Sequence, residues 1–144
     1  MLSTPHILVG GAIVKIIPNP IISLPLAILS HFLFDFIPHW DFKITLKPRP
    51  LMAALIDYVF GLALLYAVSS DQLNQLLILF GGICATGPDF LMGGVKVLNI
   101  KFLNFWPLSL LNNFHYEIQN RVNIFWGSVS SILTALISIF ILLL

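Results

Sequence analysis

The chain has 144 residues, of which 58% are hydrophobic and only 9% are charged, and its formal net charge is +1 at pH 7. Ordinary soluble domains carry about 25% charged residues, so the composition excludes that class and predicts one integral membrane domain over residues 1–144. The nearly balanced charge provides no footprint for nucleic acid, and the single cysteine, Cys84, excludes a disulfide framework within the chain.

Three apolar runs follow one another in the first half of the chain. Thr4 can cap the first helix, with Pro5 at its first position. The short run 7–17 ends at a Pro-Asn-Pro sequence, which is a strong helix breaker. The runs 21–36 and 51–68 follow, separated by a polar loop, and are predicted to be membrane helices.

The second half of the chain is predicted to contain two further spans with an interfacial segment between them. The run 75–92 is interrupted by Gly-Pro-Asp at 87–89, residues 93–123 mix aromatic and polar side chains, and 124–144 is a clean apolar run. The sequence therefore predicts an all-α bundle of four to five transmembrane helices with an interfacial cytoplasmic segment.

Basic residues gather in two of the connecting segments, which alternation of the spans places on one side of the membrane. Cytoplasmic loops carry an excess of lysine and arginine, so this side is predicted to be cytoplasmic, in a multi-pass protein of the inner (cytoplasmic) membrane. The residues that set this orientation are Lys43, Lys47 and Arg49 in one segment and Lys96, Lys101 and Arg121 in the other.

The most informative polar stretch lies at the end of the second run, over residues 30–41. His31 and Asp35 are four residues apart, so on a helix they share one face. The proline at position 38 disfavours helical geometry at the residue before it, so His39 and Asp41 are expected on a turn just beyond the helix. Four groups able to bind metal or transfer protons therefore converge on one helix end.

The remaining ionisable groups fall on the same predicted side. Asp57 is six residues into the third run, about 9 Å below its start, where an aspartate costs about 2.5–3.5 kcal/mol unless it has a partner. All four histidines and all the acidic residues except Asp71 belong to this set. The members outside the 30–41 stretch are His6, Asp57, Asp89, His115 and Glu117.

Each of these residues also has a structural interpretation. His31 and Asp35 can form a buried hydrogen-bonded pair that holds helices together, and His6 can solvate a helix start. Asp57 can cap a neighbouring helix terminus, and Asp89 can be a cap where a helix restarts after Gly-Pro.

Imidazole and carboxylate groups together suit a divalent transition metal, with zinc as the first expectation and iron or manganese as alternatives. One or two ions are compatible with the set. A pair of ions can activate water and clamp a phosphoryl oxygen. Glu117 and Asp57 are the predicted proton acceptors, because a base need not be a ligand.

The sequence resembles a family of small bacterial membrane-bound metal-dependent hydrolases of the LexA-regulated type, which are distantly similar to zinc-dependent phospholipase C. The resemblance covers roughly residues 4–121, through Thr-Pro-His at 4–6, the 30–41 stretch, Gly-Pro-Asp at 87–89 and a later Phe-His. The family motif His-Arg-x-x-Thr-His is replaced here by His-Tyr-Glu-Ile-Gln at 115–119. The metal ligands that the resemblance implies are His6, His31, Asp35, His39, Asp41, Asp89 and His115.

The leading functional hypothesis is metal-assisted hydrolysis of a phosphoester, with a lipid head group entering sideways from the membrane at the cytoplasmic leaflet. The alternative is a metal-ion or proton carrier, or a non-catalytic protein that binds metal or lipid. A carrier should show polar groups continuing toward the far side, and few are present. A homo-oligomer contributing such a path is compatible with the sequence, as is a purely structural polar cluster. Membrane lipid is the expected partner.

Overall fold

The computed structural model describes residues 1–41, 47–98 and 106–144, and the prediction of an all-α fold is confirmed for this part of the chain. An isolated β-bridge also joins His39 to Arg121. The helices are α1 (Ser3–Ile16), α2 (Pro20–Asp35), α3 (Pro48–Val68), α4 (Gln75–Leu98), α5 (Trp106–Ile118) and α6 (Ile124–Leu143).

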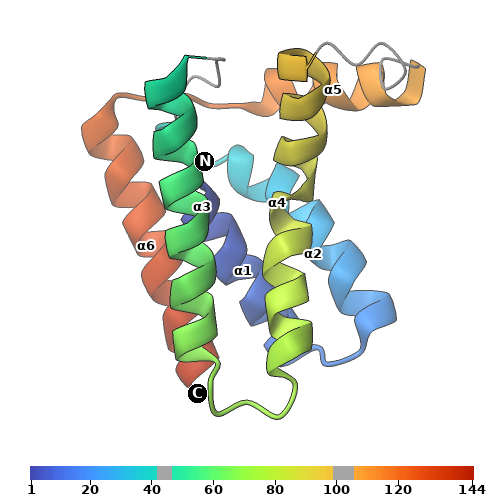
Figure 1. Ribbon diagram of the computed structural model, residues 1–144, viewed down its shortest axis with the longest axis vertical. Helices are drawn as coiled ribbons and strands as arrows, with labels where there is room; N and C mark the ends of the chain where they lie inside the picture. Colours follow the sequence, from blue (N-terminus) through green and yellow to red (C-terminus); the bar gives the residue numbers. More distant parts are fainter. Residues whose placement is uncertain (42–46, 99–105) are drawn as a thin grey trace.

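The short helix α1 lies at the centre of the bundle, in contact with α2, α3, α4 and α6 (Figure 1). It is largely apolar, and most of its residues are buried, as expected of a helix surrounded by others. Two glycines allow α1 and α4 to cross closely, because a Cβ atom on Gly10 or Gly81 would overlap the other's main chain. The surrounding core is aliphatic and includes Ile7, Leu8, Leu65, Ile78 and Leu142.

The start of α1 is capped by a neighbouring helix rather than by its own sequence. The prediction that Thr4 caps α1 is wrong, since the N-cap residue is Leu2 and no side chain caps the helix locally. Instead, the main-chain nitrogens of Ser3 and Thr4 donate to Asp57 Oδ2 of α3 at 2.6 and 3.3 Å. The exposed amides at the start of a helix need acceptors, and α3 provides one.

Two helices extend beyond their predicted limits. The predicted interruption at 87–89 is wrong, because α4 continues through Pro88 although this proline has no N–H to offer the Cys84 carbonyl. Helix α3 begins at Pro48 rather than at position 51. Asp57 is therefore about 13 Å along the helix, deeper than the sequence indicated.

Within the described residues, three helices are long and apolar enough to cross a membrane: α3, the Gln75–Gly93 part of α4, and α6. Helices α1 and α2 have 14 and 16 residues, and rises of about 21 and 24 Å fall short of a hydrocarbon core of about 30 Å. The count of four to five spans stays a prediction, and Lys43 and Lys101 lie outside the described residues. Large apolar side chains cover the outside of the bundle, as expected of a membrane protein, and include Ile56, Phe60, Leu76, Ile132 and Phe140.

The fold brings the start of α1 and the end of α2 together inside the bundle. The two helices form an antiparallel hairpin, and the N-terminus lies below the start of α3 (Figure 1). The Met1 nitrogen is 2.7 Å from Asp35 Oδ1 at the end of α2. Helix α5 lies across the same end of the bundle (Figure 1). The polar residues at these helix ends are consequently recessed from the ends of the long helices.

Candidate metal centre

Four helices contribute to one buried polar cluster. His31 and Asp35 come from the last two turns of α2, where their spacing places them on one face as predicted, and neither is exposed. His6 comes from the first turns of α1, Asp89 from α4 and His115 from the end of α5. Residues far apart in the sequence thus meet at one point because the α1–α2 hairpin ends there.

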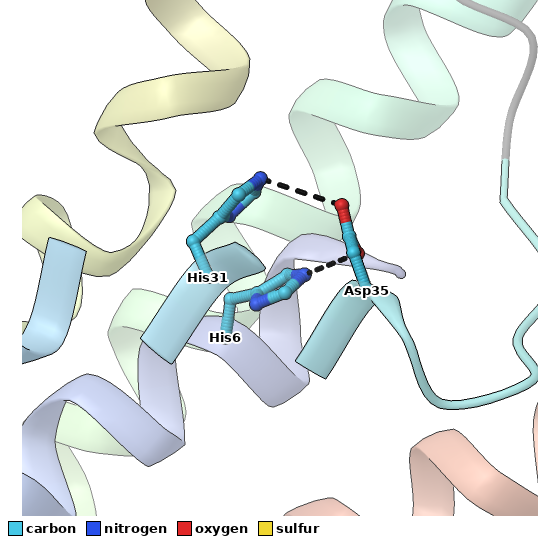
Figure 2. Close-up of side chains that lie close together, drawn as sticks. All are labelled: His6, His31 and Asp35. Atoms are coloured by element: carbon cyan, nitrogen blue, oxygen red, sulfur yellow. Dashed lines mark hydrogen bonds and ion pairs between the residues drawn. The ribbon is translucent and has the colours of Figure 1, made fainter. Parts of the chain in front are cut away.

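The Asp35 carboxylate lies beside two stacked imidazole rings, and Figure 2 shows both rings directing a nitrogen toward it. His6 Nε2 is 3.2 Å from Asp35 Oδ1 and His31 Nε2 is 3.5 Å from Asp35 Oδ2. The main-chain nitrogen of Met1 is also 2.7 Å from Oδ1. The side chains of His6, His31 and Asp35 form one group whose ligand atoms all lie within 4.8 Å of one another.

A second group shares His31 and adds Asp89 and His115. His31 Nε2 lies 3.4 Å from Asp89 Oδ1 and 3.4 Å from His115 Nε2. His115 Nε2 lies 3.8 Å from Asp89 Oδ1 and 2.7 Å from Asp35 Oδ2. Asp89 is the most exposed member, with 27% of its side chain accessible, so it marks the open side of the cluster.

The orientation of His31 is fixed by the main chain of α4. Its Nδ1 is 2.9 Å from the Ala85 carbonyl oxygen, to which it donates. With the proton on Nδ1, the Nε2 lone pair faces the two carboxylates. Metal-binding histidines are usually held by such a bond from the other ring nitrogen.

His39 is held beside the cluster by the segment that follows α5. Its main-chain N–H donates to Asn120 O and its carbonyl accepts from Val122 N, both at 3.0 Å. Its Nδ1 donates to the Ile37 carbonyl at 2.8 Å, while its buried Nε2 has no hydrogen-bond partner within the described residues. That nitrogen is 3.8 Å from Asp35 Oδ1, and burial lowers the pKa of His39, which favours the neutral form that binds metals.

Three residues near His115 were missed by the sequence analysis. His115 Nδ1 is 2.8 Å from Met92 Sδ, and the Gln119 amide nitrogen is 3.1 Å from His115 Nε2. Arg121 Nη2 donates to Gln119 Oε1 at 2.7 Å. The sequence spacing could have indicated Met92 and Gln119. Met92 is one helical turn after Asp89, and Gln119 is four residues after His115.

Besides His39, three predicted site residues lie outside both groups. Asp41 is 3.8 Å from Arg121 Nη2, and burial raises its pKa to about 6. Asp57 holds the start of α1, where the Thr4 hydroxyl also donates to its Oδ1 at 2.7 Å. Glu117 is exposed on α5. The ligand role of Asp41 and the proton-acceptor roles of Asp57 and Glu117 therefore stay predictions.

The arrangement can hold a metal ion. Ligand atoms bound at about 2.0–2.1 Å around a tetrahedral ion are separated by about 3.3 Å, close to most of the separations among His31, Asp89, His115 and Asp35. The buried Nε2 of His39, which has no hydrogen-bond partner among the described residues, is also suited to binding a cation. Comparison of the chain with models of known protein families, with curated proteins and with solved structures returned no match.

Proposed function

We propose that the protein is a membrane-embedded, metal-dependent hydrolase that cleaves a phosphoester, with a lipid head group as its substrate. The observation that carries the proposal is a buried cluster of histidines and aspartates, recessed at one end of an apolar bundle. His31, Asp35, Asp89 and His115 are the residues that would hold the ion. A bound divalent ion activates a water molecule and polarises a phosphoryl oxygen.

The apolar core beyond the cluster favours hydrolysis over transport. The α1 residues that follow His6 pack in an aliphatic core with Leu65, Ile78 and Leu142. Buried hydroxyl groups further along the bundle, such as Ser69 and Ser138, donate to carbonyls of their own helices at 2.7 and 2.9 Å. A carrier needs polar groups that continue across the membrane, and these two hydroxyls are instead engaged by their own helices.

The open side of the cluster suits an anionic substrate that comes from the lipid. Asp89 is partly accessible and is followed by Phe90, whose side chain is 57% exposed on the apolar surface. Arg121 is connected to His115 through Gln119 by two short polar contacts. A guanidinium group binds phosphate oxygens well, so Arg121 is the residue that would orient the phosphoester.

The predicted orientation places this chemistry on the cytoplasmic side of the inner membrane. Lys47 precedes α3 and Arg121 lies between α5 and α6, and both are at the end of the bundle where α5 lies. The positive-inside rule supports a cytoplasmic location for that end. The substrate would then be a phospholipid of the inner leaflet.

The test is head-group or phosphate release from mixed phospholipid vesicles by the purified protein, with and without a chelator. We expect metal-dependent release, and we expect His31→Ala and Asp35→Ala to lose both metal and turnover, because a missing ligand leaves the site incomplete. Arg121→Gln should keep the metal but reduce kcat/KM by about 10- to 100-fold, the effect of losing a hydrogen bond to a charged group.

Asp71→Asn, in the turn between α3 and α4, is the matched control and should leave metal content and turnover unchanged. No release from any lipid by metal-loaded protein would contradict the hydrolase proposal and favour a binding or carrier role. Full activity in the presence of the chelator and in both ligand variants would exclude this cluster as the active site.

A further inference from the structure

The two oxygens of Asp35 face different pairs of histidines. Oδ2 lies 2.7 Å from His115 Nε2 and 3.5 Å from His31 Nε2. Oδ1 lies 3.2 Å from His6 Nε2 and 3.8 Å from His39 Nε2. A carboxylate placed in this way can bind one cation through each oxygen.

His31 can serve only one of two ions. Its Nδ1 donates to the Ala85 carbonyl, so Nε2 is its only ligand nitrogen. That nitrogen lies within 3.5 Å of Asp89 Oδ1, His115 Nε2 and Asp35 Oδ2. His31 Nε2 therefore belongs with Asp89, His115 and Asp35 Oδ2, whereas His6 Nε2 lies 3.2 Å from the other oxygen, Oδ1, which also accepts from the Met1 nitrogen.

His39 is the second histidine beside Asp35 Oδ1. Its side chain is completely buried, its Nδ1 is bonded to the Ile37 carbonyl, and its Nε2 has no hydrogen-bond partner within the described residues. A buried polar atom without a partner costs free energy, and a bound cation would remove that cost. The main-chain bonds of His39 to Asn120 and Val122 hold the ring in place beside Asp35.

We propose that the centre holds two metal ions bridged by Asp35, the second one bound by His6, His39 and Asp35 Oδ1. The first ion has four protein ligands, whereas the second has three and an open position for water or substrate, the arrangement typical of catalytic zinc sites. The second ion replaces the Met1 nitrogen as the cation partner of Oδ1. This proposal rests on the metal centre of the proposed function and specifies its nuclearity.

The test is the metal content and magnetic coupling of the full chain in detergent, loaded with Zn²⁺ or Mn²⁺. Wild type should bind about two ions per chain, and two Mn²⁺ ions about 3.5–4 Å apart should give an exchange-coupled electron paramagnetic resonance spectrum. His39→Gln should retain only the ion of the first set and give the spectrum of isolated Mn²⁺. Asp89→Asn should weaken the first ion selectively, and Asp71→Asn should keep both.

The outcomes separate this proposal from the proposed function. One ion per wild-type chain without coupling would overturn the second site, while metal-dependent lipid hydrolysis would still support the hydrolase. No bound ion in wild type would overturn both. If His39→Gln elutes as aggregate, the wild-type stoichiometry and coupling decide the question alone, and a folded His39→Gln that keeps both coupled ions would overturn the assignment of His39.

Discussion

Asp35 is the residue on which the polar cluster depends. Its carboxylate is buried and is within 3.8 Å of nitrogens from four histidines. A buried carboxylate is costly unless cationic or hydrogen-bonding groups surround it. Burial of the Asp35 carboxylate costs free energy, and the same burial makes it suitable for binding cations.

Asp57 has a structural task that can be separated from catalysis. Its carboxylate accepts from the first amides of α1 and from the Thr4 hydroxyl, so Asp57→Ala, which removes both acceptor oxygens, should lower the free energy of unfolding by about 1–2 kcal/mol, the usual cost of a lost cap. Thermal unfolding in detergent measures this loss, with Asp71→Ala as the control. Unchanged stability and metal content together with lost turnover would instead identify Asp57 as the predicted proton acceptor.

The sequence predicted part of this site residue by residue. His31 and Asp35 could be paired from their spacing alone, because residues four apart on a helix share a face. Arg121 could not be placed, because it lies beyond the end of α5, where no helical periodicity relates it to α2. The role of His39 as a neighbour of Asp35 Oδ1 likewise depends on the bridge to Arg121.

At the scale of the elements, close contacts at glycines set the positions of the helices that hold the site. Gly10 and Gly81 bring α1 against α4. The His31 ring, which is bonded to the Ala85 carbonyl of α4, stacks on His6 of α1. Gly127 in α6 does the same for the turn after α2, because a Cβ atom there would overlap the main chain of Trp40. Small residues are common where membrane helices approach closely.

The glycine contact between α1 and α4 gives a direct test of this packing. Gly10→Ala should destabilise the fold by at least about 1–3 kcal/mol, the usual cost of overpacking, because its methyl group meets rigid main chain rather than a flexible side chain. Gly87→Ala is the matched control on α4, since no atom lies within 4 Å of its added Cβ. Equal unfolding temperatures for the two variants would contradict the packing.

At the scale of the whole molecule, the buried cluster of histidines and aspartates lies toward one end of the bundle. Cysteine labelling in intact cells, on a Cys84→Ser background, should find Lys47→Cys and Lys101→Cys accessible from the cytoplasm and Asp71→Cys from outside. The reason is the excess of basic residues on the predicted cytoplasmic side. Labelling of Asp71→Cys from the cytoplasm would reverse the orientation and move the cluster to the opposite leaflet.

The sequence by itself determined the class of protein and the position of most helices. Apolar runs separated by proline-rich or polar segments are local signals, so α2, α3 and α6 were located to within a few residues. It also identified the candidate metal ligands, because the chain has few ionisable residues and each of them can be considered individually.

Only the tertiary structure decided how these groups combine. Helix α1 is too short and too apolar for the spacing of its hydrophobic residues to show that it is the central helix. Its sequence likewise does not show that Asp57 of α3 caps its first turn. The sharing of Asp35 between two pairs of histidines depends on where α1, α2, α4 and α5 meet. The contacts to His6 and His115 join residues 29 and 80 positions apart, and they are set by helix packing in three dimensions rather than by any local pattern.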